Sequence, residues 1–326
     1  MSNLEKLQQL NTNVPRETAV FSLDNTVVKR PINLHGATQQ TVWLEKQKSA
    51  QKIQDFLRSK KNPAYFVPQM LEISCDTLSV VEERVYGQPL TTDFVKTLSD
   101  ADKDIIYRGL AHFICDMATY KPILTQSEFF DMPGDKHKHD VAPTFAYILN
   151  HMKKFLKKPE IEQLRKAKAF FDTETLNDAN VVFSHGDINE HNVFYNTETK
   201  KLSVIDVADA KYENAHDMIY RNYANLKWLD VNRLVTELNK IPQERPIITN
   251  TNPALASLRN ALQSIKWSGV QILKNPNNKS IKIRLEMLHG ETQMAFRILD
   301  TARASVTNAQ DKHLIQAQMS AVENSR

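Results

Sequence analysis

The order of apolar and polar positions divides the chain into a strand-rich beginning and a helix-rich remainder. Residues 18–30 alternate between apolar and polar side chains and break at Asp24-Asn25, which predicts a β-hairpin. Residues 38–60 carry apolar side chains at helical spacing, and Pro63 ends that stretch. The expected elements are, in order, strands at 18–23 and 26–30, a helix at 38–60, and strands at 65–71 and 77–83. They predict a small antiparallel sheet with one helix against it, after a polar helix or tail at residues 1–15.

Beyond residue 87 the pattern becomes helical. Gly87 and Pro89 mark a turn, and residues 104–120 then place their apolar side chains on one helical face. Residues 121–141 are polar and predict a loop, and nearly everything after residue 217 has helical spacing.

Residues 181–209 interrupt the helical region with a polar loop and a second hairpin. A short apolar strand precedes the loop, and strands at 192–195 and 202–205 flank turn-forming residues. The return strand ends on Asp206, so Asp187, Asn192 and Asp206 are expected at the same end of the hairpin. Two carboxylates and an amide in one place suit magnesium and a phosphate-bearing nucleotide.

Composition excludes several classes of protein. With 326 residues, 41% hydrophobic and 25% charged, the chain matches an ordinary globular protein, and a net charge of +4 is too balanced to indicate a nucleic-acid partner. Two isolated cysteines form no disulfide framework, and no apolar run approaches the roughly 18 residues of a membrane helix. A cytoplasmic protein with no membrane partner is expected.

The loop of the second hairpin resembles a known family. His185-Gly186-Asp187 followed by Asn192 is similar to the HGDxxxxN catalytic loop of the aminoglycoside phosphotransferase and choline kinase-like family, and Ile205-Asp206 is similar to its metal-binding motif. The resemblance implies an α+β, bilobal, protein-kinase-like fold. Its N-terminal nucleotide-binding lobe, including the hinge, would span residues 1–86, and its mostly helical catalytic and acceptor-binding lobe would span residues 87–326.

Roles for the catalytic loop follow from the same resemblance. Asp187 would orient the acceptor hydroxyl or accept its proton, while Asn192 and Asp206 would hold Mg²⁺ through oxygen. His185 and Asp217 would brace the loop. A solvated loop beside a hairpin and a catalytically inactive kinase fold are the alternatives.

The resemblance also assigns a nucleotide site in the first lobe. Lys29 would contact the phosphates of ATP or GTP, Glu45 would pair with Lys29, and the backbone of Glu83 and Val85 would bind the base. An exposed strand lysine, with Arg30 as its nearest competitor, and an ordinary helix-surface glutamate are the alternatives. No glycine occurs in residues 22–26, between the first two predicted strands, so a glycine-rich phosphate cover is expected to be missing.

The expected activity is a phosphotransferase acting on the hydroxyl of a small molecule, such as an amino alcohol, a sugar or an antibiotic-like acceptor. Gly186 stands where common protein kinases carry arginine, which favours a small-molecule kinase. A protein kinase or effector, and a nucleotide-binding pseudokinase that acts as an interaction module, remain alternatives.

The acceptor and the oligomeric state stay open at this point. Residues 218–326 hold 8 acidic and 15 basic residues, which disfavours a polycationic acceptor. Trp228, Tyr220 and Tyr223 could form an aromatic cage for choline or could belong to the core.

Overall fold

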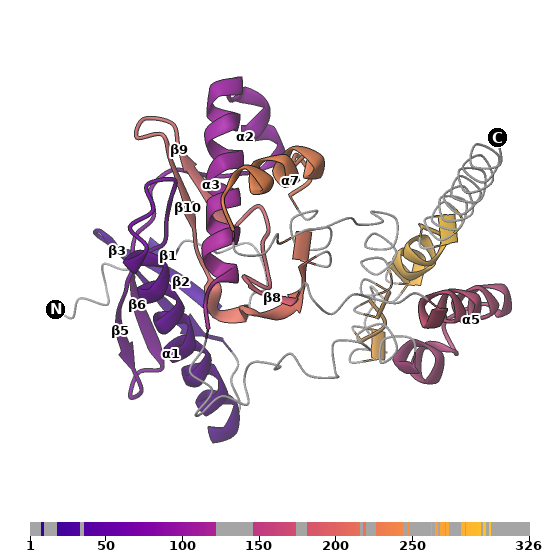
Figure 1. Cartoon of the computed structure of the whole chain (residues 1–326). Coiled ribbons are helices and arrows are strands. Elements are labelled where there is room, and N and C mark those ends of the chain that lie inside the picture. The colour runs from indigo at the N-terminus through magenta and orange to yellow at the C-terminus, as the bar shows by residue number, and fades with distance from the viewer. Residues whose placement is uncertain are drawn as a thin grey trace, which may run out of the picture. The chain divides into compact units, whose positions relative to one another are not determined.

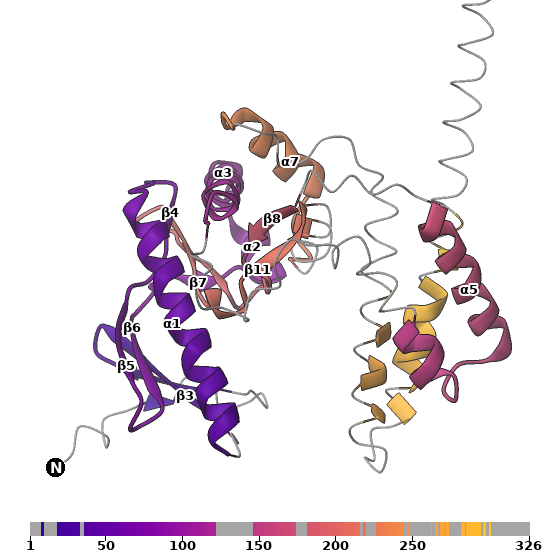
Figure 2. The same ribbon diagram turned by 60° about the horizontal axis from the view of Figure 1, so that its bottom comes forward.

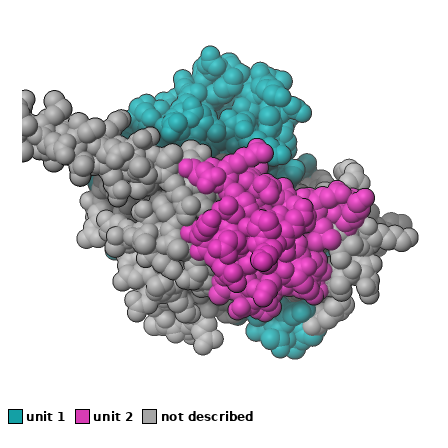
Figure 3. All heavy atoms as spheres, turned by 90° about the vertical axis from the view of Figure 1, so that its right-hand side faces the viewer, with its two compact units in different colours: residues 1–132, 181–248 teal, residues 133–180, 249–326 magenta. Residues whose placement is uncertain are grey.

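The computed structural model describes residues 8–9, 18–32, 36–121, 146–173, 181–215, 218–219 and 226–243, with single residues and short helical pieces between 247 and 300. These residues form two compact units. Unit 1 comprises Met1–Met132 and Val181–Ile248, and unit 2 comprises Pro133–Asn180 and Thr249–Arg326 (Figure 3). The predicted lobe boundary after residue 86 lies inside unit 1 and stays a prediction.

Unit 1 begins with a five-stranded antiparallel sheet in the order β1-β2-β3-β6-β5 (Figure 1). Its strands are β1 (Gln8–Gln9), β2 (Thr18–Leu23), β3 (Thr26–Pro31), β5 (Met70–Ser74) and β6 (Ser79–Glu83). The predicted hairpin at 18–30 is confirmed, with Leu23 opposite Thr26 across the turn. The predicted polar helix or tail at the N-terminus is corrected at Gln8–Gln9, because these residues pair with β2.

Helix α1 (Ala37–Ser59) lies along one face of this sheet (Figures 1 and 2). Its 23 residues confirm the helix expected at 38–60. The helix is mostly polar and presents a narrow face to the protein. The side chains buried on that face are Gln47, Ala50, Ile53, Gln54 and Leu57.

A second, four-stranded sheet has the order β4-β10-β9-β7. Its strands are β4 (Tyr65–Phe66), β7 (Gln88–Pro89), β9 (Val193–Asn196) and β10 (Lys201–Val204). The expected hairpin of the 181–209 region is confirmed as β9 and β10. The single strand expected at 65–71 is wrong: β4 pairs in parallel with β10 in this second sheet, whereas β5 belongs to the first.

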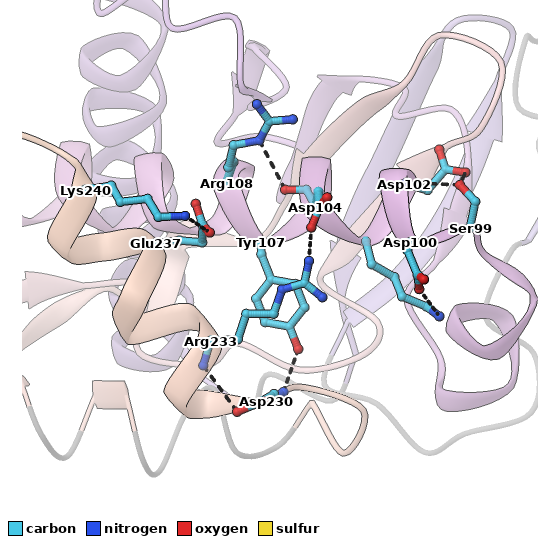
Figure 4. Close-up of polar contacts among 11 residues, drawn as sticks. Ser99, Asp100, Asp102, Asp104, Tyr107, Arg108, Asp230, Arg233, Glu237 and Lys240 are labelled. Atoms are coloured by element: carbon cyan, nitrogen blue, oxygen red, sulfur yellow. Dashed lines mark hydrogen bonds and ion pairs between the residues drawn. The ribbon is translucent and has the colours of Figure 1, made fainter.

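Helices cover the second sheet and complete the core of unit 1. Helix α2 (Thr92–Thr97) leads into α3 (Asp100–Ala118), which packs against β10 and against α7 (Val231–Lys240). Figure 4 shows Arg233 of α7 reaching toward Asp104 and Tyr107 of α3, with its guanidinium carbon 4.3 Å from the Tyr107 ring centre. The backbone N–H of Asp230 donates to the Tyr107 hydroxyl at 2.6 Å.

The remaining strands of unit 1 form a two-stranded antiparallel ribbon of β8 (Val181–Ser184) and β11 (Lys211–Asn214). Between β10 and β11 lies the short 3₁₀ helix η5 (Val207–Asp209), which contacts α1. This ribbon holds both ends of the segment that carries the predicted catalytic loop.

Unit 2 has a separate apolar core. Its described elements include η3 (Ile148–Met152), α5 (Lys158–Thr173) and helical pieces between residues 262 and 300. Fully buried Ile148, Met152 and Leu288 belong to this core. In neither unit do the described residues include a helix with the length and apolar character needed to span a membrane.

Candidate active site

The β9–β10 hairpin brings Asn192 and Asp206 to one end, as the sequence predicts. Val193 lies opposite Val204, and the backbone N–H of Ile205 donates to the Asn192 carbonyl at 3.0 Å. Asp206 follows in the left-handed conformation, with φ of 65°, and begins η5. This turn of the backbone leaves the Asp206 side chain half exposed at the end of the hairpin.

Asp187 lies beside Asn192 in the preceding loop. The Asn192 amide Nδ2 donates to the Asp187 carbonyl at 2.8 Å and to the Asp187 carboxylate at 3.3 Å. Asn189 Nδ2 also donates to that carboxylate, at 3.1 Å. Partial burial raises the pKa of Asp187 above that of an ordinary aspartate, while the Asn189 hydrogen bond acts in the opposite direction.

His185 is buried behind this loop and joins it to the end of β10. Its Nε2 lies 2.8 Å from the Ile205 carbonyl, which can only accept, so Nε2 carries the proton. Nδ1 then accepts from the Asp187 backbone N–H at 3.3 Å. Burial lowers the pKa of His185, which favours this neutral form. These contacts are those of a residue that braces the loop.

Lys29 reaches this end of the hairpin from the first sheet. Its Nζ lies 2.8 Å from the Glu82 carboxylate and 3.8 Å from the Asp206 carboxylate. The Lys29 side chain is 12% exposed and that of Glu82 is 5% exposed. Burial alone would lower the pKa of Lys29, but the charges of Glu82 and Asp206 and the Glu82 hydrogen bond raise it above its ordinary value.

The expected Lys29–Glu45 pair is wrong. Glu45 accepts from Lys48 at 2.7 Å, and the side chains of both are at least 40% exposed. The phase of α1 explains the difference, because its buried face begins at Gln47 and continues through Ala50 and places Glu45 outside it. The structure thus agrees with the alternative of an ordinary helix-surface glutamate.

Glu82 and Gln54 are the site residues that the sequence reasoning missed. Val27 lies opposite Glu82 in the β3–β6 ladder, so Glu82 is the diagonal neighbour of Lys29 on the same face. Gln54 of α1 is fully buried and donates through Nε2 to Glu82 at 3.2 Å. A glutamate directly after Val80 and Val81 in a predicted strand was the available signal, since a buried carboxylate needs a partner.

The segment after β6 is tied down by its own side chains. The Glu83 carboxylate accepts from Arg58 at 2.8 Å and from the Gln69 backbone N–H at 2.9 Å. The Glu83 N–H donates to the Gln69 carbonyl and is therefore occupied within the sheet. Val85 lies two residues further along the same segment. The assignment of both residues to the nucleotide stays a prediction.

The turn between the first two predicted strands is short and contains no glycine, as expected. Residues 24–25 form the tight β2–β3 turn, where Asp24 has φ of 50°, and the Arg84 backbone N–H donates to the Asn25 carbonyl at 2.8 Å. Lys29 lies toward the opposite end of β3, opposite Val20. Residues 10–17, which precede β2 in the sequence, lie outside the described residues and contain no glycine.

The donor atoms present fit a magnesium ion. With its Nδ2 committed to Asp187, Asn192 can present its side-chain oxygen, and Asp206 presents a half-exposed carboxylate. Among the described residues, no group of three or more His, Cys, Asp and Glu side chains is arranged to hold a metal ion. Two protein oxygens leave positions for water and phosphate oxygens, as magnesium sites in phosphotransferases require. Asp217 lies outside the described residues.

Trp228 belongs to the core of unit 1. Its indole N–H donates to the Leu90 carbonyl at 2.6 Å, and its ring packs edge-on against Tyr107 at 6.1 Å. These contacts occupy the indole in packing between α3 and the segment before α7. The structure therefore favours the core alternative for this residue, while Tyr220 and Tyr223 lie outside the described residues.

Solved structures of phosphotransferases share this fold. APH(2")-IIia, solved as its GDP and kanamycin complex, matches with a TM-score of 0.63 and 13% identity over 88% of this chain and 93% of that chain. A choline/ethanolamine kinase family protein from Mesorhizobium loti matches with a TM-score of 0.55 and 12% identity over 91% and 92%. Choline kinase LicA from Streptococcus pneumoniae matches with a TM-score of 0.52 and 9% identity over 88% and 93%. No curated protein sequence matches the chain.

The model of a sequence family described as the phosphotransferase enzyme family matches residues 48–216, which is just over half of the chain. This stretch contains the C-terminal half of α1, both strands of the β9–β10 hairpin, and Asp187, Asn192 and Asp206. The chain therefore belongs to the phosphotransferase enzyme family.

Proposed function

We propose that this protein transfers the γ-phosphoryl group of ATP or GTP to a hydroxyl of a small molecule, with Mg²⁺ as cofactor. One observation carries the proposal: Lys29 of the first sheet and Asp206 of the catalytic hairpin lie 3.8 Å apart, with Asp187 in the loop beside them. A cation, a metal-binding carboxylate and a candidate base in one place are the parts that phosphoryl transfer requires.

Each side chain then has a defined task. Lys29 binds phosphate oxygens as a fixed positive charge, and Asn192 and Asp206 hold the metal. Mg²⁺, when bound, supplies neutralisation of the negative charge on the phosphates. Asp187 accepts a hydrogen bond from the acceptor hydroxyl and takes its proton as the phosphoryl group is transferred. The raised pKa of Asp187 brings it closer to the pH at which a general base is efficient.

Solved relatives of this fold contain GDP, ADP or ATP, and several contain aminoglycosides. For the acceptor of this chain, the basic balance of residues 218–326 favours a neutral or anionic hydroxyl compound, or an amino alcohol, over an aminoglycoside. The packing of Trp228 against Tyr107 removes one side chain that a choline cage would need.

The test is nucleotide consumption against a panel of hydroxyl compounds, with ATP and GTP in separate arms and with or without Mg²⁺. For the compound turned over, Asp187→Asn should lower kcat by about 10²–10⁴-fold while ADP binding is retained. Asp93→Asn is the matched control, because Asp93 has a 95% exposed side chain on α2 and should leave kcat unchanged.

Turnover that is equal in Asp187→Asn and the wild type would refute the assigned mechanism. Saturable nucleotide binding without turnover on any acceptor would instead favour a pseudokinase. Transfer of a radiolabelled γ-phosphoryl group to protein would favour a protein kinase.

A further inference from the structure

A cavity of about 370 Å³ lies in unit 1, and none of its lining residues belongs to the predicted active site. It is formed where α1 ends and where β4 pairs with β10. Buried Leu57, Tyr65 and Val67 give it an apolar part. The residues lining the cavity are Leu57, Arg58, Lys61, Asn62, Pro63, Tyr65, Phe66, Val67 and Lys201.

Three of the lining side chains are cationic and none is anionic. Arg58 has one carboxylate partner, Glu83, which lies outside the lining. For Lys61 and Lys201 no carboxylate partner occurs among the residues that the structure describes. The cavity therefore carries an excess of positive charge that the neighbouring side chains do not neutralise.

Two of these cations lie near the same aromatic ring. The Arg58 guanidinium lies 5.7 Å from the centre of the Phe66 ring, and Lys201 Nζ lies 4.8 Å from the same ring centre. Arg58 Nη1 also donates to the Val67 carbonyl at 3.1 Å. Positive charges near an aromatic face are stabilised there, and charges that are already positioned lose less entropy when a ligand binds.

A structural reason accounts for part of this charge. Basic side chains near the C-terminus of a helix are stabilised by the helix dipole, and Arg58 and Lys61 lie at the end of α1. The helix dipole does not account for Lys201, because Lys201 comes from β10, a strand of the second sheet. Convergence of these cations from two elements on a cavity with an apolar part points to a ligand.

We propose that this cavity binds a small molecule with an apolar or flat body and one anionic group, a phosphate or a carboxylate. The anionic oxygens would lie between Lys61 and Lys201, and the body would lie against Leu57 and Phe66. Arg58 links the site to the segment after β6, because the same guanidinium bonds Glu83. A bound anion would compete with Glu83 for Arg58. Binding at the cavity would therefore change the contacts of Glu83, in the segment where the nucleotide base is expected.

The test measures binding by titration calorimetry at constant ionic strength with three probes that share a ring: phenyl phosphate, benzoate and neutral benzyl alcohol. Saturable binding of at least one anion is expected, and none of benzyl alcohol. The first two arms distinguish a phosphate from a carboxylate ligand. Lys61→Ala/Lys201→Ala should weaken binding of the anion by about tenfold or more, since two charge contacts are lost.

Lys60→Ala/Lys103→Ala is the matched control. It removes the same net charge, and Lys60 neighbours Lys61 in the chain, but neither residue lines the cavity. Binding should be unchanged in this variant. The proposal is overturned if neither anion binds saturably, or if Lys61→Ala/Lys201→Ala binds as tightly as the wild type. Arg58 is left intact because it also holds Glu83.

Discussion

Lys29 is held from its own sheet rather than from the helix. Its close partner, Glu82, lies on the adjacent strand, and Gln54 of α1 donates to the same carboxylate. Because β3 and β6 are joined by a continuous ladder, the distance between Lys29 and Glu82 is fixed when the sheet forms. Movement of α1 would therefore leave the lysine in place.

The first prediction compares two glutamates. Glu82→Gln should lower kcat/KM for the nucleotide by about tenfold and destabilise the protein by about 3 kcal/mol, because Lys29 remains buried beside a neutral side chain. It should also speed acylation of Lys29 by an amine-reactive reagent, measured by mass spectrometry, because losing the Glu82 charge lowers the pKa of Lys29. Glu45→Gln should change none of these.

The two readouts separate the structural finding from the proposed function. Faster Lys29 acylation in Glu82→Gln would support the ion pair even if no acceptor were found. Equal acylation of Lys29 in the wild type and Glu82→Gln would contradict it, as would a loss of activity in Glu45→Gln alone.

The clustering of residues that are close in sequence was predictable from the sequence, whereas the partner of Lys29 was not. Asp187, Asn192 and Asp206 lie together because one loop and one hairpin connect them. The partner of Lys29 depends on the phase of α1 and on the register of two strands that are more than 50 residues apart in sequence. Spacing from Lys29 to Glu45 carries no information on either.

At the scale of elements, the catalytic loop depends on a close backbone approach. Gly186 has φ of 80°, and a Cβ placed there would overlap the Asp209 carbonyl of η5. Only glycine lets the loop and η5 lie this close. The position of η5 is also tied to α1, through a Lys46–Asp209 ion pair at 2.9 Å.

Gly186→Ala should therefore displace the loop and cost about 1–3 kcal/mol in backbone strain, with further loss from the overlap. Activity should fall with it. Gly290→Ala is the control, because Gly290 lies in a helix with open space around it and should be neutral or slightly stabilising. Chemical denaturation of both variants measures the difference. Equal stability of the two would show that the approach of Gly186 to Asp209 does not constrain the loop.

A second prediction at this scale concerns the start of α3. The buried Asp102 carboxylate accepts from Ser99 Oγ at 2.6 Å, from Tyr195 of β9 at 2.7 Å and from Lys200 at 2.8 Å. These hydrogen bonds, that from Lys200 foremost, lower the pKa of Asp102 below the ordinary value. They join α3 to the β9–β10 hairpin.

Asp102→Ala should destabilise the protein by about 2 kcal/mol at pH 7. Because the folded-state pKa is depressed, the contribution is present above the ordinary carboxylate pKa of about 4 and is lost as pH falls through the lower folded-state value. Urea denaturation should therefore show a difference in the free energy of unfolding between wild type and variant, and this difference should narrow in acid. The Asp100 side chain is 97% exposed, so Asp100→Ala should have the same free energy of unfolding as the wild type. A gap independent of pH would contradict the assignment to a charged Asp102.

Element types were predictable where a pattern and its partner are neighbours in sequence. The hairpins at 18–31 and 193–204 follow this rule. Residues 65–71 show the limit: their apolar run indicates extended chain, but not that β4 and β5 join different sheets. Strand partners are set by contacts across the molecule, which an apolar run does not encode.

At the scale of the molecule, the resemblance in the catalytic loop predicted the architecture well. The antiparallel sheet with one helix, and the helices α2, α3, α5 and α7 that follow it among the described residues, agree with the structure. The division into units was not predictable in the same way. Unit 2 combines residues 133–180 with residues from 249 onward. Neither stretch carries a sequence motif that predicts its association with the other.

The pairing of β4 with β10 has a consequence for how the chain is made. Tyr65 pairs with Leu202, which is synthesised much later. This contact can therefore form only after the ribosome has released residue 202. Until then the strand leaving α1 has an unpaired edge, and the cavity lined by Lys201 does not exist. Such distant pairings slow folding and expose edges to aggregation. The nascent chain thus depends on the late synthesis of its catalytic hairpin to complete the fold of its first helix and strands.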